Sequence, residues 1–323
     1  MVALAGIPMD AAAIMSSVLE GILYGFSVLM CLGTIWTFTY KRHVQDVNRP
    51  IAVVATLLFV LSTAHIVVDI IHLEHGLVKY RDTFPGGPVA FFADVTQVTF
   101  VIKNAIYTLQ TLLGDGVVIY RCYVVWQSAW VIAIPCMMWC GVAASGVCSV
   151  YYFSQASMAE VENFFAAKIG HWVAAFLSST LATNMLSTGL LAYRIWTIER
   201  KVSAVCTMKR KVPILRVLID AAVLYSAALG SSIICFGLWN DGLYVMGDLI
   251  VPIISITFYM IFIRVATSQS NQHYPSAAHR ETTETERRKL QQHPLQPLIH
   301  RPNDSKFSLG DSSSSKVETH PLT

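Results

Sequence analysis

The chain has 323 residues, of which 54% are hydrophobic and only 13% are charged, and its formal net charge is +3 at pH 7. Soluble domains usually carry about 25% charged residues, so this composition excludes an ordinary soluble protein and indicates an integral membrane protein. The small net charge gives no sign of a nucleic-acid partner, and we expect none.

Apolar segments long enough to span a bilayer, which takes about 20 residues, recur along the chain. The short N-terminal stretch before them, residues 1–13, lacks a positively charged start. We therefore expect no cleavable signal peptide and direct insertion of the first span. The predicted spans are residues 14–40, 51–73, 97–126, 129–153, 172–196, 213–239 and 245–267. The predicted fold class is an all-α membrane protein, with a seven-helix transmembrane domain over residues 14–267.

The distribution of Lys and Arg among the loops predicts the orientation of the spans, because cytoplasmic loops are enriched in both. The first loop holds Lys41, Arg42 and Arg49, and the fifth, around residues 200–211, is strongly basic. The even loops are poor in basic residues and the N-terminus has none. We therefore expect an extracellular N-terminus and a cytoplasmic C-terminus, in the plasma membrane rather than an endomembrane.

Residues 268–323 differ in composition from everything before them. They are rich in Ser, Thr, Pro, Gln and His, and include the run DSSSS at residues 311–315. Such a segment cannot bury a core, so we predict a disordered cytoplasmic tail. The tail and the basic fifth loop together are where we expect any cytoplasmic signalling protein to bind.

Polar residues follow one face of the third span along its whole length. At about 100° per residue, that face carries Lys103, Asn104, Gln110, Asp115 and Arg121, and the opposite face is aliphatic. Ionisable side chains inside a membrane almost always face the bundle interior or a water-filled cavity. Polar stripes on the second, fifth, sixth and seventh spans predict a shared polar interior.

Depth along the spans divides the buried polar residues into two groups. The outer group is mixed in charge and comprises His65, Asp69, His72, Lys103, Asn104 and Asp248. These residues are the predicted binding site for a small ligand or an ion. The alternative is that they pair with one another and only specify how the helices pack, since a buried charge needs a partner in any case.

The inner group comprises Asp115, Arg121, Arg216 and Asp220. It predicts a polar latch whose ion pairs break when the bundle opens, with Arg216 the candidate contact of Asp115. Gly114 and Gly116 flank that aspartate, and small residues let a neighbouring helix approach closely in membranes. Alternatively, Arg121 extends to the lipid headgroups.

Several kinds of chemistry are excluded by the residues that they would need. His65, Asp69 and His72 share a helical face, but the seventh span has no histidine to complete the zinc set of seven-span hydrolases. That span also lacks the lysine that a retinal opsin requires. No cofactor, metal or enzymatic activity is predicted, and the seven cysteines are interpreted as small buried hydrophobic residues.

The chain resembles a large family of uncharacterised multi-span membrane proteins from basidiomycete fungi. The resemblance rests on LSTAHIVVD (61–69), KNAIYTLQTLLGDGVVIYRCYVVW (103–126), NMLSTGLLAYRIW (184–196), VLYSAA (223–228) and PIISITFYMIFIRV (252–265). The third-span pattern GDxxxIYRCYxVW is its most specific part. The family implies the multi-span architecture and no particular activity, and the resemblance does not extend to the tail.

By span count and orientation the chain is also similar to G-protein-coupled receptors, although Tyr120-Arg121-Cys122 replaces their acidic-Arg-Tyr motif. The leading prediction is a receptor-like protein that senses a small ligand through the outer group. One alternative is a transporter or proton-coupled carrier that uses the polar stripe of the third span. The other is a structural membrane protein without signalling. Membrane lipids are the expected partners in every case.

Overall fold

A computed structural model of the chain describes residues 8–40, 49–155, 166–205, 213–238 and 242–264. Within these ranges the backbone is helical and contains no β-strand. They belong to one compact unit, Met1–His273, and residues 265–323 lie outside the described residues. The predicted tail and the side chains of the basic fifth loop from residue 201 are likewise outside them.

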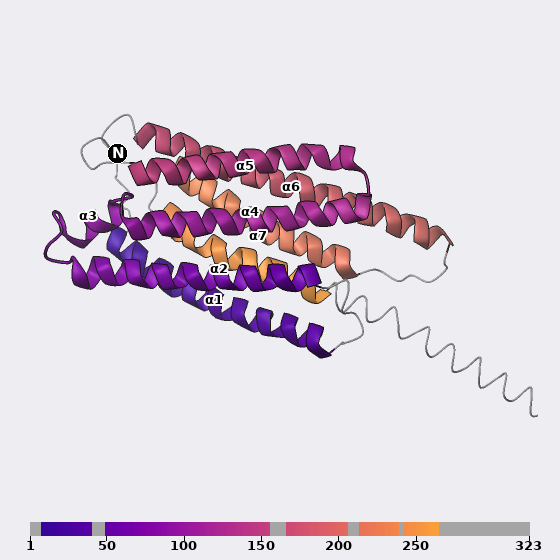
Figure 1. Ribbon diagram of the computed structural model, residues 1–323, viewed down its shortest axis with the longest axis horizontal. Coiled ribbons are helices and arrows are strands. Elements are labelled where there is room, and N and C mark those ends of the chain that lie inside the picture. The colour runs from indigo at the N-terminus through magenta and orange to yellow at the C-terminus, as the bar shows by residue number, and fades with distance from the viewer. Residues whose placement is uncertain (1–7, 41–48, 156–165, 206–212, 239–241, 265–323) are drawn as a thin grey trace, which may run out of the picture. The chain divides into compact units, whose positions relative to one another are not determined.

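Seven long helices account for most of the described residues and are drawn in Figure 1. They are α1 (Met9–Tyr40), α2 (Arg49–Glu74), α4 (Val98–Trp126), α5 (Ala129–Gln155), α6 (Ala166–Val205), α7 (Pro213–Gly237) and the last helix, Gly242–Arg264. The prediction of an all-helical protein is confirmed. Several helices extend past the predicted spans, because helical structure continues into the polar headgroup region where apolar residues become sparse.

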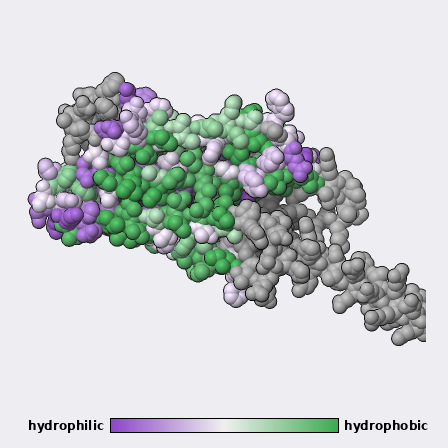
Figure 2. Space-filling view, viewed as in Figure 1, coloured by the Kyte–Doolittle hydropathy of each residue, from purple (hydrophilic) through white to green (hydrophobic). Residues whose placement is uncertain are grey.

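Six helical stretches are long and apolar enough to cross a membrane. They are Met9–Trp36, Ala52–Lys79, Gly87–Trp126, Trp130–Gln155, Val217–Gly237 and Gly242–Arg264. The long helix α6 is not among them, and its many Ser and Thr residues explain its lower hydropathy. Figure 2 shows hydrophobic residues over most of the visible face between its ends. These are the helices of a multi-pass membrane protein, while the count of seven spans remains a prediction.

Helix α1 shows the reversed polarity that a lipid environment favours. Met15, Val18, Ile22 and Phe26 recur at helical spacing and are exposed, whereas the polar residues between them, such as Glu20, are buried. In water such a helix would expose its apolar stripe to solvent at a large cost in free energy. In a bilayer the apolar stripe faces lipid tails, and the polar stripe is left to pair inside the bundle.

Helix α4 occupies the centre of the bundle, packed against α2, α5 and α6. It is also joined to the last helix, because the Gln110 amide donates to the Val251 carbonyl at 2.7 Å and to the Ser255 hydroxyl at 2.9 Å. One turn further, a Cβ on Gly114 would lie 3.0 Å from Cε2 of Phe258. The expected close approach at Gly114 is thus present, and the approaching helix is the last one.

A two-residue turn joins α4 to α5, with only Gln127 and Ser128 between the helices. Gln127 adopts a left-handed conformation with a φ of 52°, and its N–H donates to the Tyr123 carbonyl at 2.8 Å. This αL geometry closes a helix C-terminus by satisfying one of its free carbonyls. A connection this short is typical of neighbouring antiparallel helices, and Figure 1 shows α4 and α5 as such a hairpin.

A short helix between α2 and α4, α3 (Gly87–Ala93), was not predicted from the sequence. It follows η2 (His75–Lys79), a single π-helical turn that continues α2. Phe91 and Phe92 of α3 are buried against the start of α1 and the end of α2. A Cβ on Gly76 would overlap Phe92 and lie 2.8 Å from Cδ1 of Phe91, so α3 is seated directly on the η2 backbone.

Two glycines of α5 offer a matched test of this packing. A Cβ on Gly146 would lie 2.5 Å from Cγ2 of Thr108 and 3.1 Å from Cε2 of Phe176, whereas a Cβ on Gly141 would meet nothing within 4 Å. Gly146→Ala should therefore lower the unfolding free energy by about 1–3 kcal/mol through overpacking, and Gly141→Ala should not lower it. Thermal unfolding of both variants in one detergent provides the comparison. Equal midpoints for the two variants would contradict the close packing at Gly146.

Candidate functional site

The candidate site is built around the ammonium group of Lys103, a residue on α4 that is only 3% exposed. The Lys103 Nζ lies 2.7 Å from Oδ1 of Asp69 on α2 and 2.8 Å from Oδ1 of Asp248 on the last helix. It also donates to the Tyr244 hydroxyl at 3.2 Å. One cation therefore ties together three helices that are distant in sequence. We call Glu20, His65, Asp69, Lys103 and Asp248 the Lys103 cluster.

Helix α1 completes this cluster with residues that the sequence prediction missed. Glu20 Oε1 lies 2.7 Å from His65 Nδ1, and both side chains are 1% exposed. The Ser16 hydroxyl donates to Oδ2 of Asp248 at 2.6 Å, and the Ser17 hydroxyl donates to Oδ2 of Asp69. A usable signal was present, because Glu20 is the only charged residue between positions 11 and 40 and intramembrane carboxylates are rarely incidental.

Three carboxyl groups thus converge in the cluster. Glu20, Asp69 and Asp248 each place a carboxylate oxygen within 4.8 Å of the others. The second oxygen of Glu20, Oε2, has no hydrogen-bond partner among the described residues. The cluster thus has three carboxyl groups but only one lysine and one histidine, and this balance affects which ligands can bind beside it.

His72 and Asn104, also predicted to be at the binding site, make other contacts. His72 Nδ1 lies 2.6 Å from the Thr99 hydroxyl, and its ring packs against Phe91 and Phe92 of α3. Asn104 donates from Nδ2 to the Phe100 carbonyl of its own helix at 3.0 Å. Neither residue is bonded to the Lys103 cluster in the described structure.

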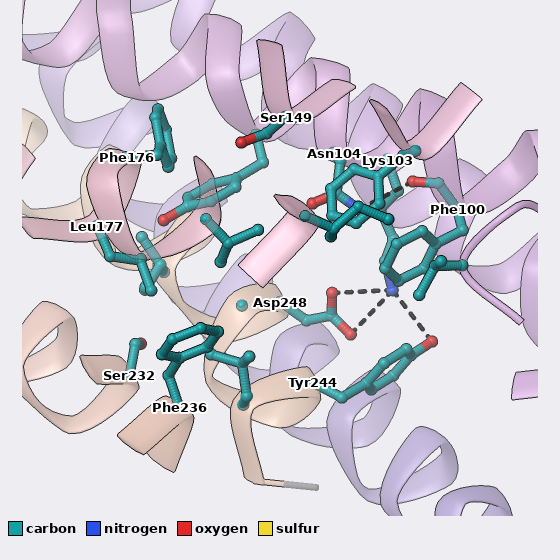
Figure 3. A pocket seen from close by; sticks show the side chains of 18 of the residues that line it. Phe100, Lys103, Asn104, Ser149, Phe176, Leu177, Ser232, Phe236, Tyr244 and Asp248 are labelled. Carbon is teal, nitrogen blue, oxygen red and sulfur yellow. Dashed lines mark hydrogen bonds and ion pairs between the residues drawn. The ribbon is translucent and has the colours of Figure 1, made fainter. Parts of the chain in front are cut away.

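A cavity of about 480 Å³ adjoins the cluster and is drawn in Figure 3. Of the predicted binding residues, His65, Lys103, Asn104 and Asp248 line it, and Asp69 and His72 do not. Most of its wall is apolar and comes from α4, α5, α6, α7 and the last helix. The aromatic part of that wall comprises Phe92, Phe100, Tyr107, Phe153, Phe176, Phe236 and Tyr244. A mostly apolar cavity with a few convergent polar groups is the usual form of a small-molecule site.

The predicted inner group is dispersed over different surroundings. Asp115 is buried at 3% exposure, and its Oδ2 has no hydrogen-bond partner among the described residues. The Arg121 guanidinium lies 4.7 Å from the centre of the Phe262 ring. Asp220 is exposed on α7, and the side chain of Arg216 lies outside the described residues. Within the described part of the chain, no ion pair joins Asp115, Arg121 and Asp220, so a latch among these residues is not seen.

Comparison with known proteins does not assign the chain to a family. No protein-family model, no curated protein and no solved structure matches the chain. The helices themselves define the class of protein, a membrane-embedded multi-pass α-helical protein. What it does must be argued from the cluster and the cavity.

The Lys103 cluster predicts a strong dependence of stability on its single cation. Lys103→Met leaves the carboxylates of Asp69 and Asp248 facing each other without a counter-ion, and breaking a buried ion pair in this way costs about 3–5 kcal/mol. The expected result is a large fall in the thermal unfolding midpoint of the purified protein. Lys79→Met, at an exposed lysine of η2, is the control and should change the midpoint little. A Lys103→Met midpoint equal to that of the control would contradict this account.

Proposed function

We propose that the protein is a receptor-like plasma-membrane protein that binds a small, mostly apolar ligand in the cavity beside the Lys103 cluster. The observation that carries this proposal is the coincidence of a cavity of about 480 Å³ with the most heavily bonded polar cluster in the described structure. An apolar ligand would reach such a site from the lipid phase or from the outer aqueous phase.

The residues that line the cavity explain how ligand binding would change the arrangement of the helices. Its lining comes from both arms of the α4–α5 hairpin and from α6, α7 and the last helix. A ligand that contacts all of these elements favours the arrangement in which they close around it. The predicted readout is a change at the cytoplasmic fifth loop and tail, where we propose that a signalling protein binds.

Filling the cavity tests the proposal. Ser149 of α5 lines the cavity and is labelled in Figure 3, while Ser154 of the same helix is exposed. A panel of lipophilic small molecules would be screened by thermal shift on the full chain in lipid nanodiscs. Ligands that bind should raise the unfolding midpoint of the wild type and of Ser154→Phe, and should lose that effect in Ser149→Phe, because the added ring occupies the cavity.

Two outcomes would overturn the proposal. One is the absence of any stabilising compound across a broad panel. The other is that stabilising compounds act equally on Ser149→Phe and Ser154→Phe, which would mean that they bind elsewhere.

A second candidate function, a proton-coupled carrier, is favoured by the polar stripe of α4. Between Lys103 and the turn that joins α4 to α5, the buried atoms Gln110 Oε1 and Asp115 Oδ2 lack hydrogen-bond partners among the described residues. Unpaired polar atoms at successive depths provide sites for protons or water, as chains of carboxyl groups do in pumps and transporters.

Asp115→Asn tests the carrier function. Because Asp115 has no ion-pair partner in the described structure, its neutralisation should leave the unfolding midpoint unchanged or slightly higher. If the protein is a carrier, a pH-driven flux in proteoliposomes should be present in the wild type and abolished in the variant. A flux that survives Asp115→Asn, or the absence of flux across a broad substrate panel, would count against the carrier.

A further inference from the structure

The bonding of Lys103 limits what it can offer to a ligand. An ammonium group has three N–H donors and no acceptor. In the Lys103 cluster these donors are directed to Asp69, Asp248 and the Tyr244 hydroxyl. The nitrogen also lies 4.4 Å from the centre of the Tyr244 ring. Although Lys103 lines the cavity, it has no donor left for the carboxylate or phosphate of a ligand.

Asp248, unlike Lys103, has hydrogen-bonding capacity that the cluster does not use. Its carboxylate lines the cavity and accepts from Lys103 and from the Ser16 hydroxyl. An ionised carboxylate has about four lone-pair positions, so Asp248 retains the capacity to accept a further hydrogen bond. In Figure 3 the Asp248 carboxylate lies next to the Lys103 amine, at the polar end of the cavity. The cluster therefore presents a free acceptor to the cavity and a fully used cation.

The charge of the cluster also favours a cationic ligand. Lys103 balances one of the two aspartates that it contacts, Asp69 and Asp248. The three carboxyl groups of Glu20, Asp69 and Asp248 face one lysine and one histidine in the cluster. With the carboxyl groups ionised, at least one negative charge is left that no residue of the cluster neutralises. A buried charge is costly without a partner, so a cation beside Asp248 would be stabilised.

The aromatic wall favours the same kind of ligand. The faces of aromatic rings attract cations within about 6 Å, most strongly where water is excluded. Phe100 and Tyr244 both line the cavity close to the cluster, with ring centroids 6.5 Å apart. An ammonium group at Asp248 would have a carboxylate beside it and the aromatic wall of the cavity nearby, while an apolar body would fill the remaining volume.

We propose that the cavity selects lipophilic amines, with the protonated amino group on the Asp248 carboxylate and the apolar body against Phe153, Phe176 and Phe236. This inference rests on the proposed function, because it assigns a chemical class to the ligand of the same cavity. It also changes the role predicted for Lys103, which holds Asp248 in place and does not contact the ligand.

Three probes that share a ring and differ in head group test the class of ligand. They are naphthylmethylamine, naphthylmethanol and naphthoate, each titrated into the full chain in phosphatidylcholine nanodiscs, where the lipid has no net charge to concentrate the amine. Ser149→Phe is titrated in parallel to show that binding takes place in the cavity. The amine should bind at least about tenfold more tightly than the alcohol, and naphthoate should bind most weakly.

The failures of the two proposals are distinguishable. If naphthoate binds as tightly as the amine, or all three bind equally, and Ser149→Phe abolishes the binding, amine selectivity is wrong and cavity binding stands. If none of the three probes binds the wild type, the amine proposal fails, and the cavity proposal is decided by the broader panel of compounds. If Ser149→Phe binds the probes unchanged, they bind outside the cavity and both proposals are contradicted.

Asp69→Asn separates the role of charge from the role of shape. Asp69 does not line the cavity, and asparagine keeps an oxygen for Lys103. The substitution removes one negative charge from the cluster, so the affinity for the amine should fall about tenfold, toward that of the alcohol. Alcohol binding should persist and reports that the variant is folded. If it is lost, Asp248→Asn provides the same comparison. An amine preference that survives in a folded variant would overturn the electrostatic argument.

Discussion

The contact of Lys103 with Asp69 and Asp248 is the interaction on which the rest of the structure depends. It lies where water is excluded, so each charge would be expensive without the others. Because the three residues come from α2, α4 and the last helix, their pairing specifies the rotation of those helices about their own axes. A small rotation of any one of them would lengthen the contacts between these charges.

The same interaction explains the composition of α1. This helix carries its polar residues on the face that meets the cluster and its large apolar residues on the exposed face. Ser16 and Ser17 each supply a hydrogen bond to one aspartate, and Glu20 contacts His65. Helix α1 therefore bonds to the cluster through three residues that do not line the cavity, whereas Asp248 lines it with its remaining acceptor capacity.

Helical periodicity predicted a large part of this arrangement. It placed His65 and Asp69 on one face of α2 and Lys103 on the polar face of α4, and these faces meet. It could not show that all three donors of Lys103 are used, because that depends on distances between helices. For the same reason His72 was grouped with Asp69, although in the structure it contacts Thr99 and the rings of α3. Helix α3 was missed because seven residues rich in Gly, Pro and Phe carry no helical period.

The short turn at Gln127 determines how the cavity can change in size. Lys103 on α4 and Ser149 on α5 line the cavity from the two arms of one hairpin. Each lies about 35 Å from the turn at 1.5 Å of rise per residue. Because α4 and α5 are joined only at this turn, an increase of about 3° in the angle between the two helices would increase their separation at the cavity by about 2 Å. A change too small to disturb any single helix contact near the turn would thus decide whether an aromatic ring fits between the arms.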